Sequence, residues 1–491
     1  MFRSPKYSLA GLLGEAYTDR VCEAAAFFGN AGAMSAARRE VDFYPEAYQA
    51  SLAEKLPLVG TRVCAPLETE NAGMAAQAFA DALHRGMSPL SAAGYYRIGE
   101  DGRLYLIGKS EHYHASLGHA FPGYRLIGCA RELGIPNATH NNTRGYITRL
   151  CEKRLAEATG TARRVINLET GSLAVEAGVK EMLSRFYKLD DSKKAPLYSG
   201  KVPVFLVMAD ENGGPEANYH GTTVLTQLMR GLWPELARGM ERAGLYRVVP
   251  VRPNDIADFR EKLETFNRAP YKTAGFLHEL ILMNYGGVRL SEEYVQEAYT
   301  LCRETDTATL CDEIQTGMWY DGMYLHRAYG VVPDMVVVGK GFPGGEYPAS
   351  KLLVTPEYDR LNQFGALVTN GQEELASLAY LVTMTFVEAN GAEIARLGAR
   401  FEASMRELAA AYPQLVRRAE GRGHLAALHF GDVKTAIGFA GKLGARAIDA
   451  SAQAYKVHCP PAVLLKPPVT ADERALDAIA DACRAALEEM Q

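Results

Sequence analysis

Short runs of hydrophobic residues alternate with longer helical patterns between about residues 160 and 375. Segments such as LAVEAGVKEMLSRFY and EEYVQEAYTLCRET separate the runs and carry apolar residues at helical spacing. Uninterrupted apolar strands between helices are typical of a mostly parallel sheet that is buried on both faces, so we expect an α/β core. The runs are RVINL (164–168), VPVFLVMA (202–209), YRVVPV (246–251), AGFLHELIL (274–282), ATLCDE (308–313), DMVVVG (334–339) and SKLLVT (350–355).

The regions on either side have other patterns. Residues 1–95 are rich in alanine and are predicted to be largely helical, whereas RIGEDGRLYLIGKS predicts a hairpin with a polar turn at 100–102. Helices are expected after Pro122 and over 146–158, and the C-terminal part predicts helices around one or two strands. We therefore divide the chain into a helical N-terminal extension (1–95), a first part of a small α+β domain (96–145), a large domain (146–375) and the rest of the small domain (376–491).

Composition and charge narrow the function classes. The chain has 491 residues, which is more than one hydrophobic core usually holds. Lys and Arg total 53 against 58 Asp and Glu, and no long basic block appears, so nucleic acid and anionic membranes are poor partners. No run of about 18 apolar residues predicts a membrane span. Eight scattered cysteines without metal-site spacing indicate reduced thiols, and we expect a cytoplasmic protein.

Two candidate sites follow the first strands of the alternating region. In open α/β sheets ligands bind beyond the carboxyl ends of the strands. After RVINL, Gly171 and Ser172 open a helix and offer backbone N–H groups and a hydroxyl to a phosphate; the alternative is an ordinary helix cap. After VPVFLVMA come Tyr219 and His220, where an aromatic ring could stack on a planar ligand or merely lie on a surface loop.

Two further candidates follow the central strands. Asp312 ends the run ATLC, and a buried acid there needs a partner, either a protonated heteroaromatic nitrogen or a structural cation. Lys340 follows DMVVV between two glycines, where burial would lower the pKa of its amine and make it a nucleophile; the alternative is a lysine that reaches solvent. Phosphate grip, aromatic, carboxylate and amine together fit one ligand, pyridoxal 5′-phosphate (PLP).

The stretch from 311 to 345, CDEIQTGMWYDGMYLHRAYGVVPDMVVVGKGFPGG, resembles the central signature of the class III aminotransferases, a branch of the fold type I PLP enzymes. GSLAVEAGVK is similar to the family's phosphate-binding helix start, and YHGTT to its aromatic-His-Gly segment. DGRLYLIG, LGHAFPGY and LLKPPVTADE resemble further family segments. The resemblance covers residue 96 to the end and implies a large domain with a mostly parallel sheet flanked by helices, a small α+β domain and transamination.

The resemblance also implies roles for individual residues. Lys340 would form the aldimine with PLP and, once released, act as general base, and Asp312 would hold the pyridine nitrogen protonated. The remaining cofactor contacts would be Gly171, Ser172, Tyr219, His220, Gln315 and Thr369. Thr369 matches a threonine that reaches the phosphate of the neighbouring subunit, so the resemblance implies a homodimer with shared active sites.

Departures from the family pattern concern the substrate. Glu279 matches the acid of a Glu-Pro motif but precedes Leu280, and Glu373-Glu374 stands where an Asn-Pro pair is expected. Many members carry an arginine before a glycine that grips a substrate carboxylate; here Glu420 has that place and Arg422 follows two residues later.

A histidine-rich stretch near the start of the small domain needs separate weighing. His112 lies in SEHYHASLGH, where a substrate contact is expected rather than a metal site, because no suitably spaced carboxylate or cysteine accompanies the histidines. No metal is predicted.

Three functions remain open on this sequence. The first is an aminotransferase that moves an amino group between an amine donor and a carbonyl acceptor. The second is a PLP-dependent racemase, aminomutase or decarboxylase on the same scaffold, since the cofactor residues do not distinguish these reactions. The third is a catalytically silent PLP-fold binding protein, against which the full set of Lys340, Asp312 and Tyr219 argues.

Overall fold

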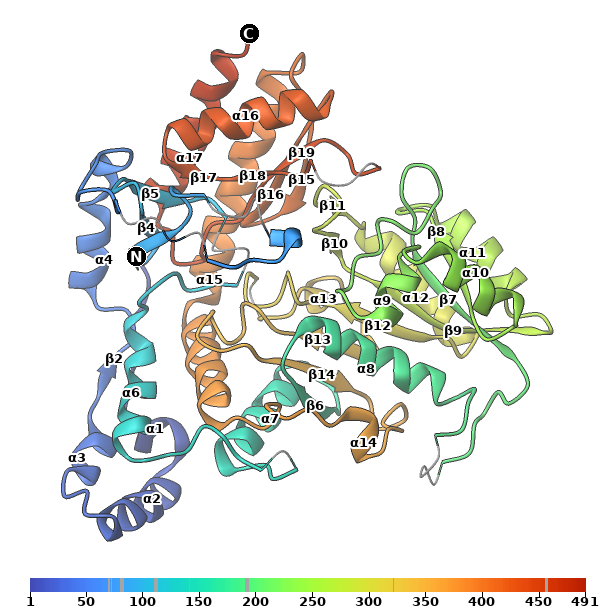
Figure 1. Cartoon of the computed structure of the whole chain (residues 1–491), viewed down its shortest axis with the longest axis horizontal. Coiled ribbons are helices and arrows are strands. Elements are labelled where there is room, and N and C mark those ends of the chain that lie inside the picture. Colours follow the sequence, from blue (N-terminus) through green and yellow to red (C-terminus); the bar gives the residue numbers. More distant parts are fainter. Residues whose placement is uncertain are drawn as a thin grey trace.

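The computed structural model describes the chain except residues 69–70, 72, 80–83, 110–113, 141, 190–193, 321 and 455–457. Figure 1 shows the large sheet and its helices at the right, the C-terminal helices and small sheets at the top, and the N-terminal helices at the lower left. Among the described helices, none is both long enough and apolar enough to cross a membrane.

The alternating region forms one seven-stranded sheet, and all seven predicted runs are confirmed as strands. The strand order is β6-β14-β13-β12-β9-β7-β8. Strand β14 is antiparallel to both neighbours, whereas the other pairs are parallel, so the sheet is mostly parallel as expected. The strands are β6 (Arg164–Leu168), β7 (Val202–Met208), β8 (Arg247–Val251), β9 (Tyr271–His278), β12 (Ala308–Asp312), β13 (Met335–Val338) and β14 (Ser350–Val354).

Both faces of this sheet are buried, in two separate hydrophobic clusters. Successive side chains of a strand point to opposite faces, so Val337 packs in one cluster and Val336 and Val338 pack in the other. Helix α8 (Gly171–Leu183) covers the first face, and α7 (Tyr146–Ala158) and α12 (Glu292–Glu304) contribute to the second. Burial on both faces explains why the strands are continuous apolar runs rather than alternating ones.

Shorter elements connect these strands and helices. They are α6 (Arg125–Glu132), α9 (Val224–Met229), α10 (Pro234–Arg242), α11 (Ile256–Thr265), α13 (Leu325–Ala328), α14 (Gln363–Ala366), β10 (Ile281–Leu282), β11 (Val288–Arg289) and the 3₁₀ turn η3 (Pro122–Tyr124). The helix expected after Pro122 and the helix over 146–158 are therefore confirmed as η3 with α6 and as α7.

Two four-stranded sheets combine strands from residues 89–107 with strands from the C-terminal part. The described residues of the C-terminal part contain β15 to β19, so the prediction of one or two strands there is wrong. The first sheet has the order β17-β5-β4-β3 and contains the predicted hairpin; the second has the order β15-β16-β19-β18. Several of these strands have only two to four residues, too short for a clear alternation. The elements are β3 (Pro89–Ala93), β4 (Tyr96–Gly99), β5 (Leu104–Ile107), α15 (Glu374–Ala411), β15 (Val416–Arg422), β16 (Leu425–Phe430), α16 (Val433–Ala445), β17 (Ile448–Asp449), β18 (Ser451–Ala452), β19 (Ala462–Leu465) and α17 (Glu473–Glu488).

The prediction of a largely helical N-terminal extension is confirmed only for its first half. Residues 54–95, where the structure describes them, contain the 3₁₀ turns η1 and η2 and strand β3 instead of α-helices. The helical first half also contains one short strand pair that the sequence did not suggest. This half packs on α6 and on the start of α7, where the Tyr17 ring stacks on Tyr146 at 4.2 Å between centroids. The other elements of the extension, besides β3, are β1 (Lys6–Tyr7), α1 (Leu9–Leu13), α2 (Glu15–Phe27), α3 (Ala33–Arg38), β2 (Val41–Asp42), α4 (Glu46–Ala53), η1 (Leu56–Leu58) and η2 (Gln77–Phe79).

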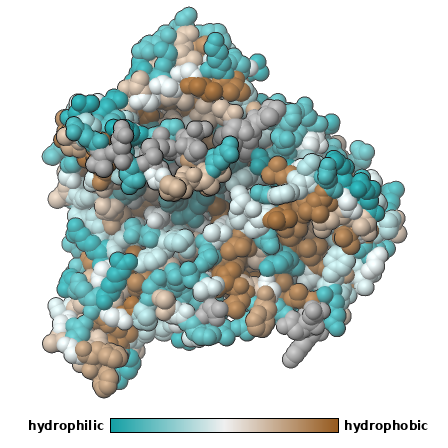
Figure 2. Space-filling view, viewed as in Figure 1, coloured by the Kyte–Doolittle hydropathy of each residue, from teal (hydrophilic) through white to brown (hydrophobic). Residues whose placement is uncertain are grey.

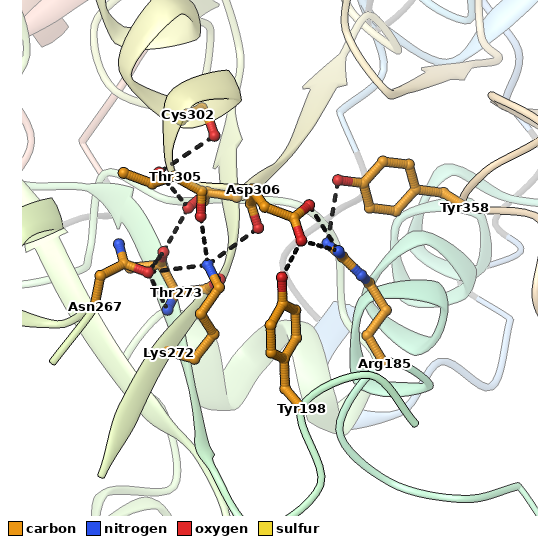
Figure 3. Close-up of polar contacts among 10 residues, drawn as sticks. Arg185, Tyr198, Asn267, Lys272, Thr273, Cys302, Thr305, Asp306 and Tyr358 are labelled. Atoms are coloured by element: carbon orange, nitrogen blue, oxygen red, sulfur yellow. Dashed lines mark hydrogen bonds and ion pairs between the residues drawn. The ribbon is translucent and has the colours of Figure 1, made fainter. Parts of the chain in front are cut away.

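A polar cluster fastens the edge of the large sheet where β12 begins (Figure 3). The buried Arg185 guanidinium donates to both carboxylate oxygens of Asp306, at 2.7 and 2.6 Å, and Tyr198 donates to the same carboxylate. Lys272 Nζ donates to the carbonyl oxygens of Thr305 and Asp306 at 2.6 and 3.0 Å. The turn before β12 is thereby tied to β9 and to the end of α8.

Removing the Asp306 carboxylate should lower the free energy of unfolding but leave the carboxyl ends of the strands, at the other edge of the sheet, unchanged. In Asp306→Ala the Arg185 guanidinium stays buried without its charged partner, which costs about 2 kcal/mol of the free energy of unfolding. Urea unfolding measures this change. The matched control is Glu297→Ala, which breaks the exposed pair of Arg260 and Glu297 and should cost less than about 1 kcal/mol. Equal losses in the two variants would contradict a special role for the cluster.

Lys272 gives the cluster a pH dependence. Burial lowers the pKa of Lys272 to about 8, against 10.5 for a free lysine. Between these values the unfolded chain binds more protons at this site than the folded chain, so the contribution of Lys272 to the free energy of unfolding rises with pH. Urea midpoints of the natural protein and of Lys272→Met, compared at about pH 7.5 and about pH 9.5, should shift in favour of the natural protein at the higher pH. An unchanged difference would contradict the lowered pKa.

Candidate active site

A cavity of about 230 Å³ lies at the carboxyl edge of the large sheet, where the ends of β6, β7, β9, β12 and β13 come together. It is lined by Thr170, Gly171, Ser172, Tyr219, His220, Gly221, Glu279, Asn284, Asp312, Ile314, Gln315 and Lys340. Eight of these residues were predicted from the sequence, and they come from five separate segments of the chain. The cavity is where ligands bind in open α/β sheets.

Lys340 follows β13 by two residues and presents its amine to the cavity. Burial lowers the pKa of Lys340, while the negative charges of Glu279 and Asp312 act in the opposite direction. A lowered pKa leaves more of the amine neutral near pH 7, which is the nucleophilic form. Its backbone φ of 41° lies in the left-handed region that residues with a side chain rarely adopt.

Asp312 is the last residue of β12, and its side chain is only 6% exposed. Its Oδ2 lies 2.7 Å from His220 Nδ1, and its Oδ1 accepts a hydrogen bond of 3.0 Å from the Ile314 backbone N–H. His220 Nε2 in turn lies 3.0 Å from Asn218 Oδ1. His220 and the Ile314 N–H together hold both oxygens of the carboxylate, so Asp312 lines the cavity in a defined orientation.

The start of α8 forms the opposite wall. Thr170 caps the helix, and Gly171 and Ser172 are its first residues, so free N–H groups and the positive helix end point toward the cavity. Ser172 Oγ accepts from the Thr222 backbone N–H at 3.1 Å. Gly221 has a φ of 116°, and a Cβ there would lie 2.1 Å from Ser172 Oγ. The close approach of these two segments places backbone N–H groups of the helix start at the cavity wall, an arrangement that suits a phosphate.

The cavity fits PLP in its donors and acceptors. The buried Gln315 Oε1 has no hydrogen-bond partner among the residues that the structure describes, as expected of a group that contacts a ligand. A phosphate would meet the α8 start, and the Asp312 carboxylate suits a protonated ring nitrogen. Lys340 supplies the amine for the aldehyde.

The remaining predicted residues lie elsewhere. Glu420 and Arg422 both lie on strand β15. Glu420 forms an ion pair with Arg418 at 3.0 Å, and Arg422 forms one with Glu292 of α12 at 2.8 Å. Neither side chain lines the cavity. Thr369 is exposed and also lies outside the lining. His112 falls outside the described residues.

Glu374, one of the two acids at the expected Asn-Pro position, has a structural account. Its carboxylate accepts hydrogen bonds from the backbone N–H groups of Ile147 and Thr148 at 2.9 and 3.1 Å. It therefore caps the start of α7 from a distant part of the chain and complements the positive helix end.

Sequence reasoning missed several residues around the cavity. Thr170 and Asn284 line it, and Asn218 holds His220. Lys466 was also missed, although AVLLK repeats the pattern of an apolar strand followed by a lysine that singled out VVVGK. Within the described part of the chain, no group of three or more His, Cys, Asp or Glu side chains could hold a metal ion.

Comparison with known proteins gives the family. A family model described as Aminotransferase class-III matches residues 84–487. An ornithine aminotransferase from Emericella nidulans is 32% identical over 200 residues, which is 38% of this chain and 40% of that protein. A putrescine aminotransferase from Pectobacterium atrosepticum is 31% identical over 192 residues, 38% of this chain and 41% of that protein. The matched part thus spans about two fifths of the length of these relatives.

A solved structure supports the same conclusion at the level of the fold. The ornithine aminotransferase from Toxoplasma gondii ME49 superposes with a TM-score of 0.67 at 21% identity, over 82% of this chain and 91% of that one. The family match covers most of the sequence and includes every segment that lines the cavity. The chain therefore belongs to the class III aminotransferases, whose cofactor is pyridoxal 5′-phosphate.

Proposed function

We propose that this chain is a transaminase that moves an amino group from a primary amine to a carbonyl acceptor. The observation that carries the proposal is the pairing, in one cavity, of a partly buried lysine of lowered pKa with a buried carboxylate at the neighbouring strand end. PLP, when bound, supplies an aldehyde and a ring that withdraws electrons from the substrate carbon. A second substrate, the carbonyl acceptor, completes the cycle in reverse.

The residues of the chain have separate tasks in this proposal. Lys340 Nζ holds the cofactor and then carries a proton to and from the substrate carbon, because a neutral amine can accept one. The Asp312 carboxylate holds a proton at the ring nitrogen, and His220 keeps that carboxylate in place. Gly171, Ser172 and the α8 start would bind the phosphate, Tyr219 would stack on the ring, and Gln315 would contact its hydroxyl.

We propose that the donor is an amine that reacts at a terminal primary amino group, such as a diamine or another ω-amino compound. Glu279 is a buried carboxylate in the cavity wall, and it favours a substrate with a second positive charge over a dicarboxylic amino acid. Arg422, the candidate carboxylate grip, is engaged by Glu292. The names of the ornithine and putrescine enzymes refer to compounds with such a terminal amine, which agrees with this choice.

A donor comparison tests the substrate class. The loaded enzyme is given, in separate reactions, a linear diamine, an ω-amino acid, an amino sugar and glutamate, each with the same set of carbonyl acceptors. We expect kcat/KM for the diamine to exceed that for glutamate by at least about tenfold, because placing the second carboxylate of glutamate beside the Glu279 carboxylate costs more than about 1.4 kcal/mol. Preference for glutamate would contradict the proposal.

A homodimer with shared active sites is part of the proposal. Thr369 is exposed outside the cavity of its own chain. Helix α10 has no buried residue, and exposed apolar side chains gather near α9 in Figure 2. They include Val224, Leu232, Trp233 and Leu236. A second copy that covers this surface would account for both features. Light scattering and the cofactor affinity of Thr369→Ala test the dimer: a monomer with unchanged affinity would contradict it.

The compartment proposed is the cytoplasm. None of the eight cysteines, all of which the structure describes, is joined in a disulfide, and seven of them are buried, which suits a reducing environment.

A further inference from the structure

Lys466 is a second lysine close to the cofactor cavity. It follows β19 directly, and it is fully buried (0% exposed). Its Nζ lies 3.6 Å from the centre of the Trp319 ring and donates to the Gln315 carbonyl oxygen. Its backbone N–H donates to the Gly108 carbonyl at 2.6 Å. One residue thus connects the ends of β5 and β19 with the segment that follows Asp312.

The contact between Lys466 and Trp319 is reciprocal. The Trp319 Nε1–H donates to the carbonyl of Pro467, the next residue after the lysine, at 3.2 Å. The indole also packs on the backbone next to Lys340, since a Cβ added to Gly341 would lie 2.3 Å from Trp319 Cζ3. Movement of the segment 466–467 would therefore be passed to Gly341 through a rigid ring.

The same C-terminal segment reaches Gly341 by a second route. The Val469 backbone N–H donates to the Ser116 carbonyl at 2.9 Å. The buried Ser116 hydroxyl in turn donates to the Gly341 carbonyl at 2.6 Å. Residues 466–469 therefore reach Gly341, the residue directly after Lys340, through Trp319 and through Ser116.

The backbone at Lys340 needs such support. Its φ of 41° is unfavourable for a residue with a Cβ, and such a conformation persists only where the surroundings over-determine it. Burial, together with the charge of Lys340, lowers the pKa of Lys466, so the two amines are also close enough to interact electrostatically. Burial of a lysine amine costs free energy unless other groups compensate for the lost water. The contacts of Lys466 with Trp319 and with the Gln315 carbonyl provide this compensation.

We propose that residues 466–469 are a clamp that fixes the backbone at Lys340, and that Lys466 is the positioning residue through which the C-terminal sheet sets the cofactor geometry. The clamp rests on the proposed transaminase function only where it is tested by kcat and by the KM for the amine donor. Its other readouts are cofactor affinity and the solvent access of Trp319, which need no amine donor. Failure of the clamp and failure of the donor class are therefore distinguishable.

A double-mutant cycle on cofactor affinity is the first test. Lys466→Met keeps the length of the side chain and removes its donor, and Trp319→Phe removes the indole. Each should weaken PLP binding about tenfold, the effect of one lost hydrogen bond, and the double variant should lose clearly less than the hundredfold product. For Lys466→Met, kcat should fall about tenfold with a change in donor KM of less than about threefold. If the double variant lost the full hundredfold in PLP affinity, Lys466 and Trp319 would act independently, and the proposed clamp would be wrong.

Fluorescence of Trp319 is the second test. The chain has two tryptophans, so Trp233→Phe leaves Trp319 as the only one. In this background, Lys466→Met should raise the acrylamide quenching constant of Trp319 at least about twofold, because the closed contact over the ring is lost. The same constant before and after the substitution would overturn the proposal.

Lys351→Met is the matched control. Lys351 is also a buried lysine, 2% exposed, with its Nζ 5.2 Å from an aromatic ring centre, that of Tyr380. Its substitution should change PLP affinity by less than about twofold, and an effect equal to that of Lys466→Met would overturn the proposal. If Lys466→Met does not fold, Ser116→Ala tests the other arm. It should weaken PLP binding about fivefold to tenfold, and unchanged binding would overturn the clamp.

Discussion

Lys340→Ala should lower kcat/KM for any amine donor by at least about 10⁴-fold. The substitution removes the group that holds the cofactor covalently and the base that moves the substrate proton, and the second function alone is worth about 10² to 10⁴. After borohydride treatment, peptide mapping should find cofactor on Lys340 in the natural protein and on no residue in the variant.

The control for Lys340→Ala separates lost chemistry from lost folding. The variant should unfold at about the same urea concentration as the natural protein, because it removes a partly strained, desolvated lysine. Added methylamine should restore part of the activity, since a small amine can replace the missing base in the space left behind. Retention of more than about a tenth of the natural activity would rule out Lys340 as the reactive amine.

Asp312→Ala should have the second largest effect, a loss of roughly 10³-fold in kcat/KM. Without the carboxylate, the ring nitrogen of the cofactor loses a buried ionic partner worth about 3–5 kcal/mol. Weaker binding of PLP should accompany the loss. Steady-state kinetics at saturating PLP separates the effect on turnover from the effect on affinity.

Asp334→Asn is the matched control for Asp312. Asp334 is another acid of the same sheet, and its carboxylate accepts hydrogen bonds from Thr309 at 2.8 and 2.9 Å at the opposite, amino edge. Its substitution should lower stability but leave kcat/KM within about threefold. Comparable activity losses in the two variants would mean that Asp312 acts through the fold rather than on the cofactor.

The large sheet was predictable because each strand is buried on both faces. Runs such as VPVFLVMA have few alternative conformations, and all seven became strands of one sheet. The C-terminal sheets were not predictable in number, because strands as short as β17 and β18 are defined by their partners rather than by their own sequence. The helices in the first half of the extension were expected, but the β1–β2 pair depends on a contact between residues about 35 positions apart.

The cofactor residues were predictable because they share one rule, that of chemistry placed just after an apolar strand. Lys340, Asp312 and the pair Gly171-Ser172 follow it, and they meet in one cavity. Glu420 and Arg422 were chosen from an aligned position alone, and the structure places both in ion pairs on β15. The role of Lys466 depends on a ring that lies 147 positions earlier in the chain, Trp319, and only the folded structure brings the two together.

The central claim is transamination by this chain, and a half-reaction without acceptor tests it most directly. The loaded enzyme is mixed with a linear diamine alone, and the cofactor and products are identified by mass spectrometry. The account predicts one carbonyl product for each bound cofactor, together with conversion of the cofactor to its aminated form, and neither in Lys340→Ala. A parallel sample receives an amino acid alone. Release of carbon dioxide or inversion of the stereocentre in that sample, with the cofactor left unchanged in both samples, would contradict transamination.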